Sequence, residues 1–386
     1  MTFMSDECMR VLHIVSVMNK GGIETQIMNI YRKIDRTRFQ FDFLVTREES
    51  GIYDAEIRAL GGRIFQIPSV RESGLFKFIK NCDMFFKKHP EYKIVHCHMN
   101  TWAGLFLNVA RRNKVPVRIA QSHSAQQRAN SERGIKGMME DRFKATMKRL
   151  IPFGATHFWA CGNDAGKWLY GERIAETNMQ IVPNAKELEM FRYDVKKRTL
   201  ARNSLGLSPN DLVVGHVGSF TRVKNHRFII EVFRELHMLR EGSRLVLVGE
   251  GPLQPVIRQQ VSQLGLEDKV VFLGTRNDVH VLLSAFDVML FPSLFEGMPN
   301  VLIEAQASAL PCVISSEITP EIDFDMGLVD FLPLTYTPEK WARRLLEKSC
   351  VNRKKVSIKN LVDRGYDLQT LVNWLEEFYE GCCQAT

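Results

Sequence analysis

Two glutamates on either side of a glycine–proline turn form the most informative polar pattern in the sequence. The segment SLFEGMPNVLIEAQA, residues 293–307, places Glu296 before the turn and Glu304 in the apolar run that follows it. Gly297 allows a ligand to approach the backbone closely, and Pro299 suits the first turn of a helix because its missing N–H costs nothing there. The segment therefore predicts a loop followed by a helix, with one carboxylate on each.

A helix start at this turn would bind a particular kind of ligand. The free N–H groups at residues 297–300 would point outward, and such groups bind anionic or hydroxyl-rich molecules. Glu304 lies one turn beyond Asn300 and faces the same way, so its carboxylate can accept hydrogen bonds from a diol. Glu296 would reach the space in front of this helix start. A nucleoside diphosphate sugar matches all three features.

Glycine-rich loops upstream contain a candidate phosphate-binding lysine. In GHVGSFTRVKNH, residues 215–226, Lys224 follows Gly218 by six positions, near the start of a helix. A lysine there can reach a phosphate, although an ordinary surface lysine has the same spacing. In LVGEGP, Gly249 and Gly251 permit close approach of a ligand, but such pairs are also common in plain strand-to-helix turns.

The rest of the chain alternates short apolar runs with helix-length amphipathic segments, which is typical of parallel sheets buried on both faces. The first series of expected strands is 10–18, 40–46, 63–68, 93–99, 117–123, 157–162 and 180–185, and the second is 211–218, 244–251, 269–274, 287–293, 311–316 and 328–333. Two such series predict an α/β protein with two Rossmann-like domains in tandem. We place them at residues 1–195 and 196–363, followed by a C-terminal helix at 364–386 that packs back on the first domain.

Composition favours a soluble cytoplasmic protein. The chain has 386 residues, of which 45% are apolar and 25% charged, and no run reaches the roughly 18 apolar residues of a membrane span. Its eight cysteines are scattered without zinc spacing, which indicates reduced thiols. The first residues carry acids before a short apolar stretch, so we expect a strand there and no signal peptide.

The positive charge is concentrated in the first half of the chain. Residues 1–190 hold 29 Lys and Arg against 20 Asp and Glu, whereas the remainder holds 23 against 24. Clusters lie at 110–118 and 141–150. A basic half suggests contact with an anionic membrane surface, a phosphate-bearing acceptor or nucleic acid, and the alternative is a solvated basic surface. Of these we predict the membrane or the acceptor, and no nucleic acid.

Several ordered motifs resemble the retaining glycosyltransferases of family 4, which have the GT-B architecture. The run from Asp287 to Ser315 contains Pro292-Ser293, the two glutamates as E-x7-E, and EAQASALPCV. VGSF…KNH, LVGEGP and VVFLGTRNDV match in order, as does MNKGGIETQI at residues 18–27. The resemblance covers nearly the whole chain and is greatest to the branch that builds capsular polysaccharides and exopolysaccharides. It implies two doubly wound domains that face a deep interdomain cleft.

The resemblance also implies roles for individual residues. Lys224 would bind the donor diphosphate, Glu304 the ribose hydroxyls, and Glu296 the transferred sugar; His123, at the end of a strand, resembles the family's histidine beside that sugar. The implied catalytic residues are His123, Glu296 and Lys224. The implied donor-binding residues are Gly21, Gly22, Gly218, Ser219, Arg222, Lys224, Gly249, Gly251, Leu273, Gly274, Glu296, Gly297, Met298, Pro299, Asn300 and Glu304.

The sequence departs from the family pattern at two positions. Family members commonly carry arginine after the glycine of the phosphate loop, where this chain has Ser219, and Arg222 could reach the same phosphates because its side chain is long. Ala309 stands where glycine is usual before LPCV, and we expect no functional consequence of that change.

The expected reaction is transfer of a sugar from a nucleotide donor, with UDP as the expected nucleotide, to a saccharide or lipid-linked acceptor in cell-surface polysaccharide synthesis. The resemblance implies retention of the anomeric configuration. No DxD-like acidic pair lies at a strand end, so we predict that no metal or other cofactor is required. Two alternatives are a nucleotide-sugar epimerase of the same architecture and a non-catalytic partner subunit that binds a nucleotide sugar. We expect a cytoplasmic protein that can attach to the inner membrane face.

Overall fold

The computed structural model describes residues 8–19, 21–123 and 134–384, and the chain divides into two compact units. Unit 1 comprises residues 1–185 and 368–386, and unit 2 comprises residues 186–367. The division falls upstream of the expected boundary at 195. The reason is that the helices after residue 186 pack on the second sheet and not on the first.

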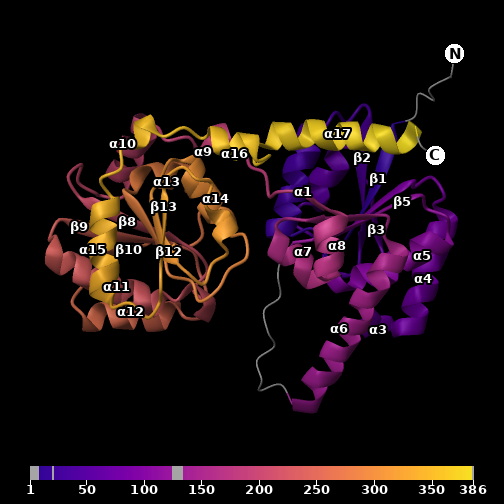
Figure 1. Cartoon of the computed structure of the whole chain (residues 1–386), viewed down its shortest axis with the longest axis horizontal. Coiled ribbons are helices and arrows are strands. Elements are labelled where there is room, and N and C mark those ends of the chain that lie inside the picture. The colour runs from indigo at the N-terminus through magenta and orange to yellow at the C-terminus, as the bar shows by residue number, and fades with distance from the viewer. Residues whose placement is uncertain (1–7, 20, 124–133, 385–386) are drawn as a thin grey trace. The chain divides into compact units, whose positions relative to one another are not determined.

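Unit 1 contains a seven-stranded, fully parallel sheet in the order β3-β2-β1-β4-β5-β6-β7 (Figure 1). The strands are β1 (Met9–Val15), β2 (Phe39–Val45), β3 (Ile64–Gln66), β4 (Ile94–Cys97), β5 (Val117–Ser122), β6 (His157–Ala160) and β7 (Met179–Ile181). Strand order reverses between β1 and β4, and this is where doubly wound sheets bind ligands, beyond the carboxyl ends of the strands.

Helices cover both faces of this sheet, as the continuous apolar strands require. The helices are α1 (Gly22–Lys33), α2 (Asp54–Ala59), α3 (Val70–Ser73), α4 (Leu75–Lys88), η1 (Asn100–Trp102), α5 (Ala103–Arg112), α6 (Gly134–Gly154), α7 (Asn163–Tyr170), α8 (Glu172–Thr177) and α17 (Leu368–Gln384). Helices α1, α2 and α17 bury apolar side chains on one face, and α4 to α7 do so on the other. Thus the C-terminal helix packs back on the first sheet, and in Figure 1 it runs along α1.

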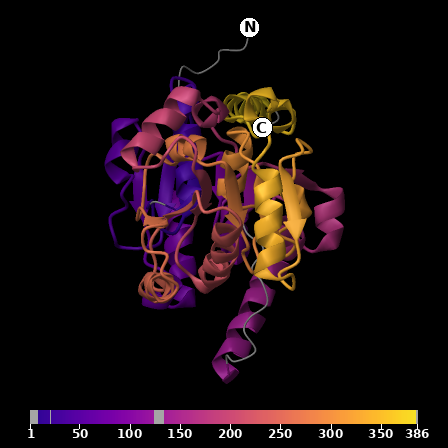
Figure 2. The same ribbon diagram turned by 90° about the vertical axis from the view of Figure 1, so that its left-hand side faces the viewer.

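The C-terminal part of helix α6 is packed into the core. Met147 and Ile151 join the apolar cluster of α4 and α5. The N-terminal turns of α6 extend beyond the rest of unit 1 in both views (Figures 1 and 2). Across the described residues, no helix has the length and apolar character needed to cross a membrane.

Unit 2 repeats the same arrangement with six parallel strands in the order β10-β9-β8-β11-β12-β13. The strands are β8 (Leu212–Val217), β9 (Ser243–Val248), β10 (Val270–Phe272), β11 (Val288–Phe291), β12 (Cys312–Ser315) and β13 (Val329–Leu332). All thirteen segments expected from the sequence are strands, with ends that differ by a few residues. Most of them are largely apolar, with polar residues at only a few positions, and this is the pattern that a doubly covered parallel strand needs.

The helices of unit 2 also form two layers. They are α9 (Leu188–Phe191), α10 (Val195–Ser204), η2 (Arg222–Lys224), α11 (His226–Leu239), α12 (Gln254–Gln263), α13 (Val279–Ala285), α14 (Asn300–Ala307), η3 (Pro320–Ile322), α15 (Pro338–Lys348), η4 (Arg353–Lys355) and α16 (Lys359–Asp363). Apolar side chains of α10, α13 and α14 pack on one face, and those of α11, α12 and α15 pack on the other. Figure 2 shows α15 beside the sheet.

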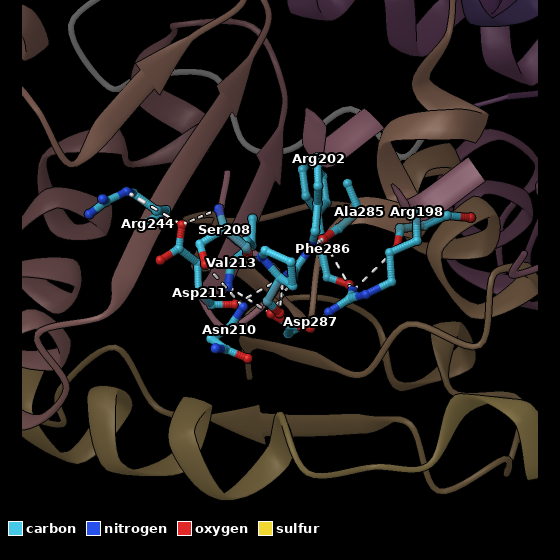
Figure 3. A network of polar contacts seen from close by, with 12 residues as sticks. Arg198, Arg202, Ser208, Asn210, Asp211, Val213, Arg244, Ala285, Phe286 and Asp287 are labelled. Atoms are coloured by element: carbon cyan, nitrogen blue, oxygen red, sulfur yellow. Dashed lines mark hydrogen bonds and ion pairs between the residues drawn. The ribbon is translucent and has the colours of Figure 1, made fainter. Parts of the chain in front are cut away.

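An ion-pair network fastens α10 to this sheet (Figure 3). Asp287, which precedes β11, accepts hydrogen bonds from Arg198 at 2.6 Å, from Arg202 at 2.7 Å and from the backbone N–H of Val213 at 2.8 Å. Arg202 also donates to the carbonyl of Ala285 at 2.9 Å, and its side chain is only 3% exposed. The network explains why the segment after residue 186 belongs to unit 2.

Asp287→Asn should lower the free energy of unfolding of unit 2 by about 3 kcal/mol, because it leaves the buried Arg202 guanidinium without a counter-charge. Hydrogen exchange of unit 2 peptides across a urea series measures this loss. The control is Glu339→Gln, which removes an exposed pair with Arg343 on α15 and should cost less than 1 kcal/mol. Equal effects of the two variants would contradict the role assigned to Asp287.

Ala309 occupies a strained position after α14. Its φ is +50°, in the left-handed region that favours glycine, and the N–H of Leu310 closes the helix end on the carbonyl of Ala305 at 2.9 Å. Ala309→Gly should therefore raise the free energy of unfolding of unit 2 by about 1 kcal/mol, without changing catalysis. The same urea series tests this, and a destabilised Gly variant would show that the Ala309 side chain contributes packing that outweighs the strain.

Candidate active site

Three glycines let three loops at the carboxyl edge of the unit 2 sheet pack backbone to backbone. A side chain at Gly249, whose φ is +130°, would lie 2.2 Å from the carbonyl oxygen of Gly218. A side chain at Gly251 would lie 2.7 Å from the backbone of Phe220. Gly274, with φ +63°, accepts a hydrogen bond from the N–H of Gly249 at 2.8 Å. Gly249 and Gly251 thus hold the loop after β9 against the loop after β8.

Lys224 lies against the loop that follows β8. Its side-chain carbons would be 3.1 Å from a Cβ at Gly218, so the glycine leaves room for the lysine stem. The ammonium lies 2.6 Å from Oε1 of Glu296 and 4.5 Å from the ring centroid of Phe291. The side chains of Lys224 and Glu296 are only 17% and 21% exposed. Lys224 is therefore a half-enclosed cation beside a carboxylate, unlike an ordinary surface lysine.

Glu296 comes from the loop between β11 and α14. The N–H of Leu294 donates to the carbonyl of Val223 at 2.8 Å, which joins this loop to the η2 turn that carries Lys224. The strand–loop–helix expectation for the segment is thus confirmed in unit 2. The sequence predicted both residues, and the structure brings their charged groups into contact.

The start of α14 differs in one detail from the expectation. Pro299 is the N-cap residue, with φ −71° and ψ 116°, and the helix begins at Asn300, so the proline precedes the first helical turn. The missing N–H of Pro299 still costs no hydrogen bond, because an N-cap N–H has no partner within the helix. No atom lies within 4 Å of a Cβ built at Gly297. Within the described chain, Oδ1 of Asn300 is buried and without a hydrogen-bond partner.

Glu304 lies further along α14 and pairs with a lysine that the sequence did not indicate. Nζ of Lys186 lies 3.3 Å from Oε1 of Glu304. Burial raises the pKa of Glu304, and Lys186 opposes this effect. The backbone N–H of Lys186 donates to the carbonyl of Tyr366 at 2.8 Å, which fixes the lysine at the edge of unit 2. Because Lys186 directly follows the last expected strand of the first domain, its spacing from other polar residues gave no signal for it.

The remaining predicted residues of unit 2 line the same loops. Ser219 and Arg222 are exposed, whereas Gly218 is half-buried. The N–H of Leu273 donates to the carbonyl of Leu247 at 2.9 Å, so Leu273 continues the β10 edge into Gly274. Met298 accepts a hydrogen bond from the hydroxyl of Tyr366 at its sulfur, 3.8 Å away. Ser219 stands where the family commonly has arginine, and the binding of the same phosphates by Arg222 stays a prediction.

Three predicted residues lie in unit 1. Gly21 caps α1 with φ −113°, and Gly22 is the first residue of that helix. A side chain at Gly21 would meet the carboxylate of Glu24, a half-buried acid that the sequence did not single out and whose pKa burial raises. His123 follows β5, and burial lowers its pKa to about 4. These residues lie at the carboxyl ends of β1 and β5, where a doubly wound sheet presents its ligand-binding groups.

One group among the described side chains resembles a metal site. Candidate ligand nitrogens of His13, His96 and His98 lie within 4.8 Å of one another, and all three residues are buried. The nitrogens around a tetrahedral zinc ion are about 3.4 Å apart, so the group would have to contract. Two of its nitrogens already form a hydrogen bond, between His13 and His98 at 3.0 Å. Metal independence of the reaction stays a prediction.

The chain matches two families of known proteins, and together the matches cover most of it. Residues 21–185 match the family described as Glycosyl transferase 4-like domain, and residues 211–347 match Glycosyl transferases group 1. The protein belongs to this family of glycosyltransferases.

Individual relatives are also named as glycosyltransferases, and they align with this chain over nearly their full length. The chain is 38% identical to the putative glycosyltransferase EpsF of Bacillus subtilis, over 96% of each chain. It is 26% identical to the UDP-Gal:alpha-D-GlcNAc-diphosphoundecaprenol alpha-1,3-galactosyltransferase of Escherichia coli, over 88% of this chain and 89% of that one. It is 25% identical to the capsular polysaccharide biosynthesis glycosyltransferase CapH of Staphylococcus aureus, over 96% and 98%.

Solved structures support the fold. HepE of Anabaena, crystallised in complex with UDP, aligns with a TM-score of 0.75 at 17% identity, over 97% of this chain and all of that one. The GT-B fold expected from the sequence is confirmed, with two parallel-sheet α/β units and a C-terminal helix that returns to the first.

Proposed function

We propose that the protein is a retaining glycosyltransferase that moves a sugar from a UDP-sugar to a saccharide or lipid-linked acceptor in cell-surface polysaccharide synthesis. The observation that carries this proposal is the contact between Lys224 and Glu296, which lies beside the start of α14 and the glycine loops of unit 2. A cation, a set of free N–H groups and two carboxylates are the groups that a nucleoside diphosphate sugar needs.

The donor is assigned to these groups by their chemistry. Lys224 and the N–H group of Ser219 would hold the diphosphate, and Glu304 would accept hydrogen bonds from the ribose hydroxyls. Glu296, with the backbone from Gly297 to Pro299, would hold the transferred sugar. UDP is favoured as the nucleotide because the E. coli relative is named for UDP-Gal and the HepE structure contains UDP.

Catalysis would depend mainly on charge stabilisation. Breaking the bond between the sugar and the diphosphate leaves additional negative charge on the departing group, and fixed donors that already point at it lower the barrier. Lys224, the backbone N–H of Ser219 and the α14 N-terminus supply such donors from this chain, and so we propose that no metal is required. His123 would act on the sugar.

The acceptor proposal rests on unit 1. Arg142 and Arg149 on α6 are exposed, as are the side chains of Phe153 at 65% and Phe76 on α4 at 89%. Cations together with exposed aromatic side chains suit an anionic lipid surface or a lipid-linked diphosphate. The name of the E. coli relative includes a diphosphoundecaprenol acceptor, and that of CapH includes capsular polysaccharide. We therefore propose a cytoplasmic protein that attaches to the inner membrane face.

Lys148 belongs to the basic cluster at 141–150, but its side chain does not join the exposed cations of that cluster. Its ammonium donates to the carbonyl of Trp168 at 2.6 Å and lies 3.6 Å from the ring centroid of that tryptophan. Burial lowers the pKa of Lys148. The side chain therefore fastens α6 to α7 and is not available to lipid.

Arg142→Gln combined with Arg149→Gln should weaken binding to vesicles that contain phosphatidylglycerol by about thirtyfold, because each surface cation contributes about 1 kcal/mol. Co-sedimentation measures the binding. The matched control replaces Arg227 and Lys359, two exposed cations of unit 2, with glutamine. Equal binding by both double variants would exclude α6 as the membrane contact.

The function is tested by mixing the full chain with a panel of nucleotide sugars, with and without lipid-linked saccharide acceptors, and following nucleotide release and the donor's fate. Steady release that needs an acceptor, with an α-linked product from an α-linked donor, supports the proposal. Isomerised donor without release would indicate an epimerase. Tight donor binding without turnover under any condition would indicate a non-catalytic partner subunit.

A further inference from the structure

Three histidines of unit 1 form a hydrogen-bonded chain across neighbouring strands. His13 lies in β1, His98 follows β4, and His123 follows β5. Nδ1 of His13 lies 3.0 Å from Nε2 of His98, and Nδ1 of His98 lies 2.8 Å from Nε2 of His123. His13 and His98 are buried, whereas His123 is partly exposed. The histidine chain therefore leads from the core to the carboxyl edge of the sheet.

Burial favours the neutral form of all three imidazoles. It lowers the pKa of His13 to about 3 and that of His123 to about 4, and it lowers the pKa of His98 well below its usual range. A neutral imidazole has one N–H group and one bare nitrogen. The two hydrogen bonds can therefore run only in one direction along the chain, or only in the other.

His13, at the inner end of the histidine chain, decides the direction of the hydrogen bonds. No described residue offers a partner to the buried Nε2 of His13. If the bonds ran inward, His13 would accept at Nδ1 and carry its proton on this unpartnered Nε2. A buried donor without an acceptor is strongly unfavourable, whereas a bare nitrogen loses less. The bonds therefore run outward, from His13 to His98 and from His98 to Nε2 of His123.

We propose that His98, held by His13, is a positioning residue that fixes His123 as the tautomer with its proton on Nδ1, so that His123 donates a hydrogen bond to an oxygen of the bound sugar. This inference rests on the proposed sugar-transfer function. It assigns His123 the role of a neutral donor, and it excludes His123 as a general base that acts through Nε2, because that nitrogen already accepts from His98. The tautomer is a property of unit 1 alone and can be measured without any activity.

The first experiment records long-range ¹H–¹⁵N spectra of the full chain with ¹⁵N-histidine, in the presence of EDTA, with the signals assigned by single substitutions. The expected result is a protonated Nδ1 and a bare Nε2 for His123. A protonated Nε2 overturns the proposal. A change of the His13 and His98 nitrogens to metal-bound shifts when Zn²⁺ replaces EDTA, with loss of the His123 tautomer, would also overturn it, because the group would then be a metal site.

The second experiment uses matched variants. The amide N–H of an asparagine at position 98 can replace Nδ1 of the imidazole, so His98→Asn should keep the tautomer of His123 and most of kcat. His98→Leu should lose the fixed tautomer and lower kcat by roughly tenfold, the effect of one hydrogen bond, with little change in the KM of the donor. Equal kcat values in the two variants, with thermal melts alike, would contradict a positioning role.

A third comparison tests the role of His123 itself. If it donates from Nδ1, His123→Asn should retain more activity than His123→Phe, because the amide offers an N–H at the same place. Equal inactivity of both variants would overturn the donor role. Failure of the wild-type chain to transfer any sugar would instead refute the proposed function, and the nitrogen shifts would still report on the histidine chain.

Discussion

Lys224→Met should abolish measurable sugar transfer and weaken binding of UDP by about a hundredfold, while the melting temperature changes by only a few degrees. The ammonium is the cation in direct contact with Glu296 beside the glycine loops, and its side chain is only 17% exposed. A charge-assisted hydrogen bond to a phosphate in such a site contributes roughly 3 kcal/mol, which corresponds to that factor in affinity. Methionine keeps the length of the stem and its packing over Phe291.

Calorimetric titration with UDP measures the affinity, and nucleotide release in the presence of acceptor measures the transfer. Lys340→Met is the matched control, since Lys340 also lies 4.5 Å from an aromatic ring centroid, that of Tyr336, on the exposed surface of unit 2. The control should bind UDP like the wild type. If Lys224→Met binds UDP as tightly as Lys340→Met does, the diphosphate is held elsewhere.

Glu296→Gln should have opposite effects on binding and on transfer. The ion pair of 2.6 Å occupies the Lys224 ammonium, so a diphosphate must compete with the carboxylate for it. Removal of this negative charge should tighten the binding of UDP several-fold. Transfer should fall by about a hundredfold or more, because the amide cannot hold the sugar hydroxyls as a carboxylate does.

The two effects are measured in the same titration and release assays. Glu339→Gln, which breaks an exposed pair with Arg343, is the control and should leave both quantities unchanged. Weaker UDP binding by Glu296→Gln would show that the Lys224–Glu296 pair prepares the lysine for the phosphate and does not compete with it. Unchanged transfer would remove Glu296 from the sugar site.

Much of this site could be predicted because its signals are local in the sequence. Most strands of both sheets are largely apolar, and the loops at their carboxyl ends carry the candidate binding residues, as the doubly wound fold requires. Glu296 and Glu304 are linked by one loop and one helix, so their spacing carried information. The contact of Lys224 with Glu296 joins two βα units, and it was not predicted; only the match of several ordered motifs assigned both residues to one donor site.

The residues that were missed act through contacts between distant segments. Lys186 reaches Glu304 because the chain entering unit 2 bonds to Tyr366 at the end of that unit. The histidine chain depends on the register of β1, β4 and β5, which no single segment contains. The contact between the Lys148 ammonium and Trp168 likewise depends on how α6 packs on α7. A basic residue in a basic cluster could not be distinguished from its exposed neighbours by sequence.

A crystal structure of the full chain with UDP bound would show whether Lys224 and the start of α14 hold the nucleotide. We expect phosphate oxygens within hydrogen-bonding distance of Nζ of Lys224 and of the N–H group of Ser219, with the ribose hydroxyls at the Glu304 carboxylate. In that complex Lys224 should have moved away from Glu296. A nucleotide bound at any other surface, with the Lys224–Glu296 pair still closed, would contradict the account.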